Sequence, residues 1–369
     1  MKILVTGAKG FIGKNLIAEL NNKGYNEILE FTRESDESLL EQYTRDCDFV
    51  IHLAGVNRPK SEQDFLEGNY NLTSNLLECL NKNDNKAPIL FTSSIQAERD
   101  NLYGKSKKAA EELLLEYSSE TDAKVYIYRL QNVFGKWSKP NYNTVIATFC
   151  HNISRNINIQ ISNTEAELNL CYIDDVIAEF LRALEGKPTV QDDNCIVPIS
   201  YKIKLGELAE LIKSFKESRV NLTIPNMEDA LTKKLYSTYL SFLPEKEFSY
   251  HLKMNTDDRG AFTEFLRTPE RGQVSVNVSK PGITKGNHWH HTKNEKFLVV
   301  SGEGLIRFRK LDSDEIIEYK VSGEKLEVVD IPIGYTHSIV NMGESDLVTV
   351  MWVNECFESE KPDTYFMEV

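Results

Sequence analysis

Short apolar runs alternate with amphipathic stretches over the first half of the chain. Apolar runs of strand length occur at residues 2–6, 27–32, 49–54, 89–92 and 124–130. Apolar positions at helical spacing lie between them, at residues 13–22, 61–81 and 105–118. Strands that alternate with helices predict βαβ units and a doubly wound parallel sheet of the Rossmann type. Ligands of such sheets bind at the carboxyl ends of the strands.

The pattern changes near residue 250, where short β-rich runs are separated by Gly, Pro, Asp and Asn. These runs lie at residues 273–279, 296–300, 304–310, 315–321, 325–331 and 347–352. Closely spaced short strands predict an all-β sandwich or barrel. A helical pattern at residues 226–240 comes before this change, and it is ended by Pro244 and a charged stretch. We therefore predict one domain at residues 1–246 and a second at residues 247–369.

Composition and charge narrow the classes of function. Of the 369 residues, 41% are hydrophobic and 27% are charged, as in an ordinary globular protein. The formal net charge of -13 argues against nucleic acid or an anionic membrane as a partner of the whole chain. The apolar runs are too short for a membrane helix or a signal peptide. The six cysteines include no CxxC pair, which suits the reduced thiols of a cytoplasmic protein.

A glycine-rich turn follows the first predicted strand and opens a helix. Its glycines, Gly7, Gly10 and Gly13, follow the spacing G-x2-G-x2-G. Glycines let the backbone approach a pyrophosphate closely, and the helix N-terminus adds free N–H groups and a positive dipole. We therefore predict a dinucleotide site here. Its predicted contacts are Gly7, Lys9, Gly10, Phe11 and Ile12, with Leu53 and Ala54 at the end of the third predicted strand.

The end of the second predicted strand bears on which cofactor binds. A carboxylate there typically binds the 2′-hydroxyl of NAD(H), whereas an arginine suits the 2′-phosphate of NADP(H). Arg33 stands just past this strand and can form bidentate, charge-assisted bonds with phosphate, so we predict NADPH. Glu30 keeps NADH open as the alternative, with Arg33 as an ordinary solvated arginine.

Tyr103 and Lys107 are four residues apart, which makes them neighbours on one helix face. A nearby ammonium lowers the pKa of a phenol, and such a tyrosine can protonate a carbonyl oxygen as hydride arrives. Taken alone, a Tyr-x3-Lys pair is more often a surface pair. Ser94, with Ser93 as the fallback, follows the strand at residues 89–92 and offers a hydroxyl to the same oxygen.

Together these residues resemble the extended short-chain dehydrogenase/reductase family. The resemblance includes R-x2-N-V-x-G at residues 129–135 and C-Y-I-D-D-V at residues 171–176. It implies Ser94, Tyr103 and Lys107 as catalytic residues, with Tyr103 and Lys107 also contacting the cofactor. It further implies Ser94 and Asn132 as contacts to the substrate. Only eight residues separate Ser94 from Tyr103, fewer than is usual in this family, so we expect a short loop over the substrate.

A second cluster of candidate ligands lies in the β-rich half. His288, His290 and Glu295 follow the spacing G-x5-H-x-H-x4-E-x6-G, and His337 lies in P-x-G-x2-H-x3-N. Residues two apart on a strand share a face, so His288 and His290 can share an ion. The two segments resemble the cupin motifs. This resemblance implies a double-stranded β-helix with His288, His290, Glu295 and His337 as metal ligands.

Three imidazoles and one carboxylate suit zinc, iron, manganese, nickel or cobalt, and we expect zinc first. His291 is a reserve ligand, although it points to the opposite face from His290. The segment D-D-R-G-A-F at residues 257–262 resembles one in nucleotide-sugar epimerase cupins. That resemblance implies Arg259 as a contact to a substrate diphosphate. An arginine that anchors a turn is the alternative.

The order of the two domains resembles a family of bifunctional capsular-polysaccharide enzymes over essentially the whole chain. The resemblance implies that the cupin epimerises C3 of a UDP-2-acetamido-2,6-dideoxy-4-ketohexose. The reductase domain then reduces the C4 ketone with NADPH. The implied product is UDP-2-acetamido-2,6-dideoxy-L-talose, on the route to UDP-N-acetylfucosamine, and a homodimer is expected. Two alternatives stay open: a single-function reductase with a structural or dimerising cupin, and a sensor that holds NADPH without turnover.

Overall fold

A computed structural model describes the chain except for residues 57–64, 193 and 269. Residues 61–64 of the helix predicted at 61–81 therefore lie outside the described residues. The chain divides into two compact units, the first formed by Met1–Ser214 with Glu228–Glu245 and the second by Phe215–Met227 with Lys246–Val369. The boundary at residue 246 stays a prediction. In the part of the chain that is described, none of the helices is long and apolar enough to cross a bilayer.

The first unit is built on a seven-stranded, mostly parallel sheet of order β2-β1-β3-β4-β5-β9-β8. Its strands are β1 Lys2–Thr6, β2 Glu27–Phe31, β3 Phe49–His52, β4 Ile89–Ser94, β5 Val125–Leu130, β8 Val190–Gln191 and β9 Asn194–Cys195. β1 pairs in parallel with β2 on one side and with β3 on the other, so the strand order reverses there. The carboxyl edge at such a reversal is where doubly wound sheets bind ligands.

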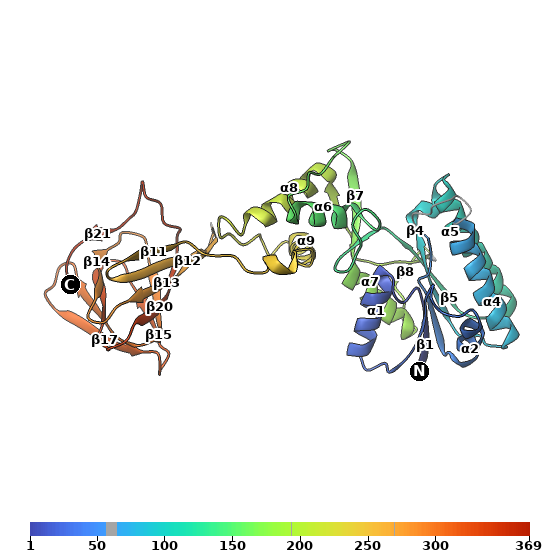
Figure 1. The fold of residues 1–369 in the computed structure, drawn as a ribbon, viewed down its shortest axis with the longest axis horizontal. Helices are drawn as coiled ribbons and strands as arrows, with labels where there is room; N and C mark the ends of the chain where they lie inside the picture. Colours follow the sequence, from blue (N-terminus) through green and yellow to red (C-terminus); the bar gives the residue numbers. More distant parts are fainter. Residues whose placement is uncertain (57–64, 193, 269) are drawn as a thin grey trace. The chain divides into compact units, whose positions relative to one another are not determined.

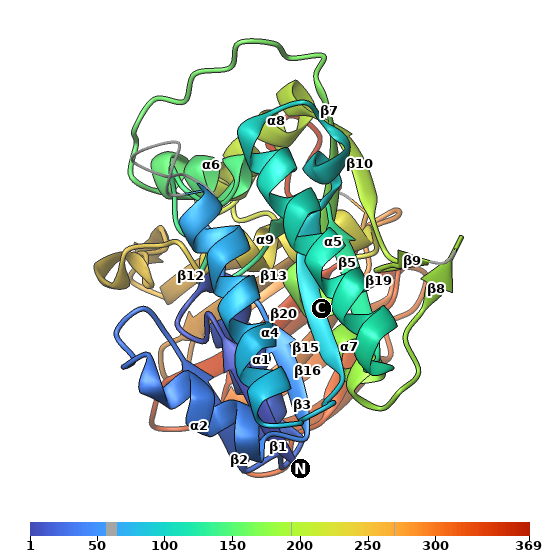
Figure 2. The same ribbon diagram turned by 90° about the vertical axis from the view of Figure 1, so that its right-hand side faces the viewer.

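Helices cover both faces of this sheet (Figure 1), which is why all four residues of β3 are buried. On one face, apolar residues of α1 Phe11–Asn22 and α7 Ile173–Leu184 share a core with β1 and β3. Figure 2 shows α4 and α5 running side by side over the other face. The helices there are α2 Ser38–Asp46, α4 Leu72–Lys82 and α5 Leu102–Thr121. The predicted Rossmann-type fold is therefore confirmed.

Smaller elements complete the first unit. A three-stranded sheet has the order β10-β7-β6, with β6 Asn132–Phe134, β7 Glu167–Tyr172 and β10 Tyr201–Lys204. The remaining α-helices are α6 Val145–Ser154, α8 Leu205–Glu217, whose last three residues belong to the second unit, and α9 Ala230–Leu240. Short helical turns are η1 Leu66–Asn71, η2 Ile95–Glu98 and η3 Glu245–Glu247, the last at the junction of the units.

The second unit consists of two antiparallel sheets around an apolar core. The six-stranded sheet has the order β11-β12-β13-β20-β15-β18 and the five-stranded sheet the order β17-β16-β19-β14-β21. The strands of the first are β11 Met254–Asp257, β12 Gly260–Thr268, β13 Gly272–Ser279, β20 Leu347–Val353, β15 Glu295–Ser301 and β18 Val328–Ile331. Those of the second are β17 Ile316–Ser322, β16 Glu303–Lys310, β19 Tyr335–Asn341, β14 Thr284–Trp289 and β21 Tyr365–Phe366.

The core of this unit is formed by side chains from both sheets, including Phe297 and Val299 of β15 and Ile306 and Phe308 of β16. Alternate residues of β13 are buried, as expected for strands with one inward face. The prediction of an all-β second domain is confirmed.

Candidate functional site

The glycine-rich turn lies at the carboxyl ends of β1 and β3. Gly7 has φ of +72°, and a Cβ at this position would lie 2.8 Å from the backbone nitrogen of Ala54. A Cβ on Gly13 would lie 2.4 Å from the carbonyl oxygen of Gly7. Side chains at these positions would therefore push the turn, the β3 loop and α1 apart. α1 begins after Gly10 without a side-chain cap, so its first N–H groups are left for a ligand.

His52, at the end of β3, fixes the loop that carries two of the predicted cofactor contacts. Its Nδ1 atom lies 2.6 Å from Oγ1 of Thr6, and its Nε2 atom lies 3.0 Å from Oγ1 of Thr73. Thr6 Oγ1 also accepts a hydrogen bond from the backbone of Ala54 at 3.2 Å. Burial lowers the pKa of His52 to about 3, so the imidazole is neutral. His52 thus holds Leu53 and Ala54 beside the glycine-rich turn.

Two cations lie near the carboxyl end of β2. Arg33 is exposed just past this strand, and Glu30 is exposed on it. The Nζ atom of Lys9, from the glycine-rich turn, lies 2.5 Å from Oε2 of Glu34. This hydrogen bond raises the pKa of Lys9 and lowers that of Glu34. Arg33 and the Lys9–Glu34 pair therefore lie near the end of β2, the part of a doubly wound sheet that typically holds the adenine ribose.

Ser94 and Tyr103 are brought together from β4 and α5. Ser94 is the last residue of β4, and its Oγ accepts a hydrogen bond from the backbone of Gln96 at 3.2 Å. Burial raises the pKa of Tyr103, and a hydrogen bond with Ser94 works against this rise, so the lowering expected from Lys107 is not found. The serine and tyrosine hydroxyls are therefore neighbours at the carboxyl edge of the sheet and can donate hydrogen bonds to the same ligand atom.

Lys107 extends from α5 to the loop after β3. Its side chain is 5% exposed, and Nζ donates a hydrogen bond to the carbonyl oxygen of Thr92 at 3.0 Å. Burial lowers the pKa of Lys107 to about 8. A Cβ on Gly55 would lie 3.0 Å from Nζ, so the ammonium group ends beside the loop predicted to contact the cofactor.

The remaining candidates of the first unit differ in their accessibility. Ser93, the fallback for Ser94, is 5% exposed, and its Oγ has no hydrogen bond to the described residues. Asn132 is exposed on β6 and donates a hydrogen bond to the carbonyl oxygen of Asn169 at 3.0 Å. Ser94 therefore fits the predicted role better than Ser93, because it is less buried and contacts Tyr103.

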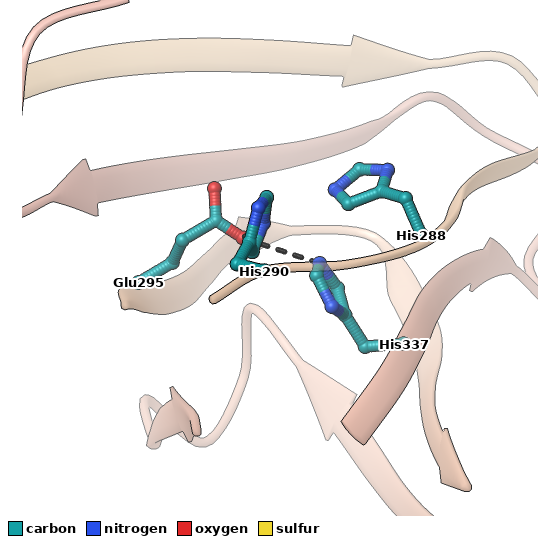
Figure 3. A group of neighbouring side chains, drawn as sticks. All are labelled: His288, His290, Glu295 and His337. Carbon is teal, nitrogen blue, oxygen red and sulfur yellow. Dashed lines mark ion pairs between the residues drawn. The ribbon is translucent and has the colours of Figure 1, made fainter. Parts of the chain in front are cut away.

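Four side chains of the second unit converge on one point (Figure 3). His288 lies on β14, His290 just after it, Glu295 on β15 and His337 on β19. Each offers one ligand atom, and these atoms all lie within 4.8 Å of one another. Burial lowers the pKa of His288 to about 4. Burial opposes ionisation of Glu295, but the imidazoles of His290 and His337 lower its pKa to about 2.

The chemistry of this group fits a divalent metal ion. Nε2 of His290, Oε2 of Glu295 and both ring nitrogens of His337 are buried without a well-formed hydrogen bond to the described residues. Buried polar atoms in this state cost free energy unless something binds them. His290 Nδ1 lies 2.5 Å from the carbonyl oxygen of Asp363, which leaves Nε2 for an ion. The reserve ligand His291 is exposed, with its ring against Trp289 and Tyr365 rather than in the group.

Asp363 was missed by sequence reasoning. Its carboxylate accepts hydrogen bonds from the backbone N–H groups of His291, Thr292 and Lys293 at 3.0, 2.9 and 2.9 Å. Burial opposes ionisation, but these bonds hold the pKa of Asp363 below its usual range. Asp363 therefore fixes both the loop after His290 and the ring of His290. No motif marks it, because the contact spans more than seventy residues.

The four candidate ligands line a cavity of about 930 Å³ inside the second unit. This volume is in the range of small-molecule sites, about 300–1,000 Å³. Arg259 also lines the cavity, and its exposed guanidinium lies 2.6 Å from a carboxylate oxygen of Asp257. Lys285, Ser275 and Asn277 are further polar lining residues that sequence reasoning did not single out.

Comparisons with known proteins agree with the division of the chain into two units. Residues 3–195 match the NAD dependent epimerase/dehydratase family, and residues 255–365 match the polysaccharide biosynthesis C-terminal domain. A UDP-2-acetamido-2,6-beta-L-arabino-hexul-4-ose reductase from Pseudomonas aeruginosa is 49% identical over 100% of this chain and 99% of its own length.

Solved structures resemble the whole chain or a large part of it. The capsular polysaccharide assembling protein CapF from Staphylococcus aureus is 57% identical, with a TM-score of 0.95 over 100% of both chains. A UDP-glucose 4-epimerase from Thermotoga maritima shares the fold over 68% of this chain and 100% of its own, with 21% identity and a TM-score of 0.56.

Proposed function

The chain belongs to the NAD dependent epimerase/dehydratase family, and on this premise we propose that it is a bifunctional nucleotide-sugar enzyme. Its second domain, residues 247–369, epimerises C3 of a UDP-2-acetamido-2,6-dideoxy-4-ketohexose. Its first domain, residues 1–246, then reduces the C4 ketone with NADPH. The product is UDP-2-acetamido-2,6-dideoxy-L-talose, for the UDP-N-acetylfucosamine route to capsular polysaccharide. The observation that carries the proposal is the hydrogen bond between Ser94, at the end of β4, and Tyr103, in a chain 49% identical to a hexulose reductase.

The reductase step is assigned to Ser94, Tyr103 and Lys107. NADPH supplies the hydride that reaches C4. Ser94 donates a hydrogen bond to the ketone oxygen and orients it, while Tyr103 transfers its phenolic proton to that oxygen. Lys107 binds the nicotinamide ribose and, as an ammonium, favours the phenolate left on Tyr103. Asn132 is proposed to contact the substrate. NADPH rather than NADH is proposed because Arg33 lies exposed just past β2, where a 2′-phosphate is typically bound, and Lys9, which is paired with Glu34, adds a second cation there.

The epimerase step is assigned to the cavity of the second unit. His288, His290, Glu295 and His337 would hold a divalent ion, proposed to be zinc, which supplies Lewis acidity. A proton α to a ketone is acidic, so removal of the C3 proton followed by protonation of the opposite face of C3 inverts this centre while the ketone is kept. Arg259 is proposed to bind the substrate diphosphate because it lies exposed among the residues that line this cavity.

We also propose a cytoplasmic homodimer. The edge strand β17 exposes Ile316, Ile317 and Tyr319, which are 49%, 39% and 45% exposed. Long apolar edge strands are normally covered, and pairing with a second copy would cover this one.

A single-function reductase is the second candidate, with the second domain in a structural or dimerising role. The name of the Pseudomonas aeruginosa relative mentions only reduction, which favours this alternative. The two are separated by NMR of the product formed from the 4-ketohexose and NADPH. A product with inverted C3 and reduced C4 supports both activities, whereas reduction at C4 with C3 unchanged supports the single function.

A further inference from the structure

A β-bulge turns Lys285 toward the candidate metal ligands. In the β14–β19 pair, Lys285 lies opposite Ile339. His288 lies opposite His337 in the same pair. Directly opposed residues share a face of the sheet, as do His337 and Ile339, which are two apart. Lys285 and His288 therefore share this face although they are three apart, because the register shifts at Asn287, where φ is +58°.

The amino group of Lys285 has two fixed partners and one open position. Nζ donates hydrogen bonds to Oδ1 of Asn277 and to the carbonyl oxygen of Val278, both at 2.8 Å. The amide of Asn277 is oriented in turn, since its Nδ2 lies 3.1 Å from Oγ of Ser279. A tetrahedral nitrogen that makes two such bonds has a third position, which is a lone pair in the amine and an N–H in the ammonium. The group is thus positioned to accept or to donate one proton.

The wall of the cavity around Lys285 suits a sugar. Gln273, Ser275 and Asn277 line it from β13 and are at most 4% exposed. The Oγ atom of Ser275 has no hydrogen bond to the described residues, so it is left for a ligand hydroxyl. Burial lowers the pKa of Lys285, although the carboxylate of Asp257 works against this change. A lowered pKa raises the fraction of the amine form at a given pH.

We propose that Lys285 is the acid–base residue that removes the proton from C3 of the 4-ketohexose, an assignment that rests on the proposed epimerase function. The amine lone pair takes the C3 proton, the C–H electron pair forms the C3–C4 double bond, and the ketone π pair moves onto the C4 oxygen. A proton from water then adds to the opposite face of C3 as the double bond reverts to the ketone, and the ammonium returns its proton to water.

The test measures deuterium incorporation at C3 by NMR, using the full-length, metal-loaded protein in D₂O without NADPH. Lys285→Arg keeps the positive charge, but a guanidinium does not accept a proton, so exchange is expected to fall at least about 100-fold. Exchange at C3 should fall by a similar factor in Lys285→Ala, and adding ethylamine should restore part of it. Lys296→Met, which changes an exposed lysine on β15 paired with Asp330, should exchange like the wild type.

Metal content and circular dichroism are recorded for each variant. Lys285→Arg with full metal content and wild-type exchange would overturn the assignment of Lys285 and leave the epimerase function standing. Loss of exchange that follows loss of metal in both Lys285 variants, without rescue by ethylamine, also contradicts it. Absence of exchange in the wild type would instead refute the proposed epimerase function itself.

Discussion

The Nε2 atom of His337 lies 3.1 Å from Oε2 of Glu295, and neither atom has a well-formed hydrogen bond to the described residues. Both side chains are almost fully buried, at 1% and 7% exposed. A divalent ion between them would satisfy both atoms together with His288 and His290. A bound ion is therefore expected to stabilise the second unit.

Replacing one ligand should remove the ion and destabilise the second unit. We expect His337→Ala to bind less than about a tenth of the metal bound by the wild type, because three ligands bind far more weakly than four. The midpoint of the second unit's thermal transition should fall by at least about 5 °C. Metal analysis and calorimetry measure both effects. His291→Ala is the matched control, and an equal loss of metal in that variant would contradict the ligand set.

Tyr103→Phe should abolish ketone reduction while leaving the cofactor bound. Removing the phenolic proton donor is expected to lower kcat for NADPH oxidation by about 10²- to 10⁴-fold. The affinity for NADPH, measured by fluorescence titration, should change little, because the ring remains in place. Tyr43→Phe, on α2, serves as control. A Tyr103→Phe variant that reduces the ketone at the wild-type rate would exclude Tyr103 as the donor.

Lys107 should make the first unit less stable at neutral pH than at alkaline pH. Its folded-state pKa of about 8 lies below the ordinary value of 10.5, so between these values the unfolded state binds more protons. The contribution of Lys107 to stability therefore rises as pH goes from 8 to 10.5, and burial of its ammonium costs about 3 kcal/mol below pH 8.

Lys107→Met lacks this cost, although it also loses the hydrogen bond to Thr92. The free energy of unfolding is measured in urea, without cofactor, for Lys107→Met and for the wild type. The value for the variant minus the value for the wild type should be about 3 kcal/mol lower at pH 10.5 than at pH 7. The difference between two proteins isolates Lys107, since other groups titrate alike in both. A difference that is the same at both pH values would show that the lysine titrates normally.

Arg33→Ala should reduce the preference for NADPH over NADH. Charge-assisted bonds to a phosphate contribute about 1.5–3 kcal/mol, so kcat/KM for NADPH should fall about 10- to 100-fold. The value for NADH should change little, because NADH has no 2′-phosphate. Arg45→Ala, an exposed arginine on α2, is the control. An equal fall in kcat/KM for NADPH and for NADH would show that Arg33 does not bind the 2′-phosphate.

Sequence patterns predicted the elements whose apolar periodicity is strong. The run at residues 2–6 coincides with β1, and the second ends within one residue of β2. Both domain types also follow from the alternation of elements, because buried parallel strands and short antiparallel strands leave different apolar patterns. By contrast, β12 carries Glu264 among the residues that line the cavity and shows no clear apolar run, so the pattern does not predict it.

Other features depend on geometry that leaves no local pattern. Regular alternation along β14 would place Lys285 on the opposite face from His288, and only the bulge at Asn287 reverses this. The carbonyl oxygen of Asp363 reaches His290 across 73 positions of sequence. Spacing therefore indicated the four candidate ligands, while the residues that orient them and share their cavity required the fold.

Exchange at C3 tests the central claim, that one chain epimerises and then reduces its substrate, most directly. The purified wild type and His290→Ala are incubated with the 4-keto UDP-sugar in D₂O, first without NADPH and then with it. The account predicts deuterium at C3 before NADPH is added, loss of this exchange in His290→Ala, and NADPH oxidation by the wild type once the cofactor is present. Oxidation of NADPH without deuterium at C3 would contradict it and leave a single-function reductase.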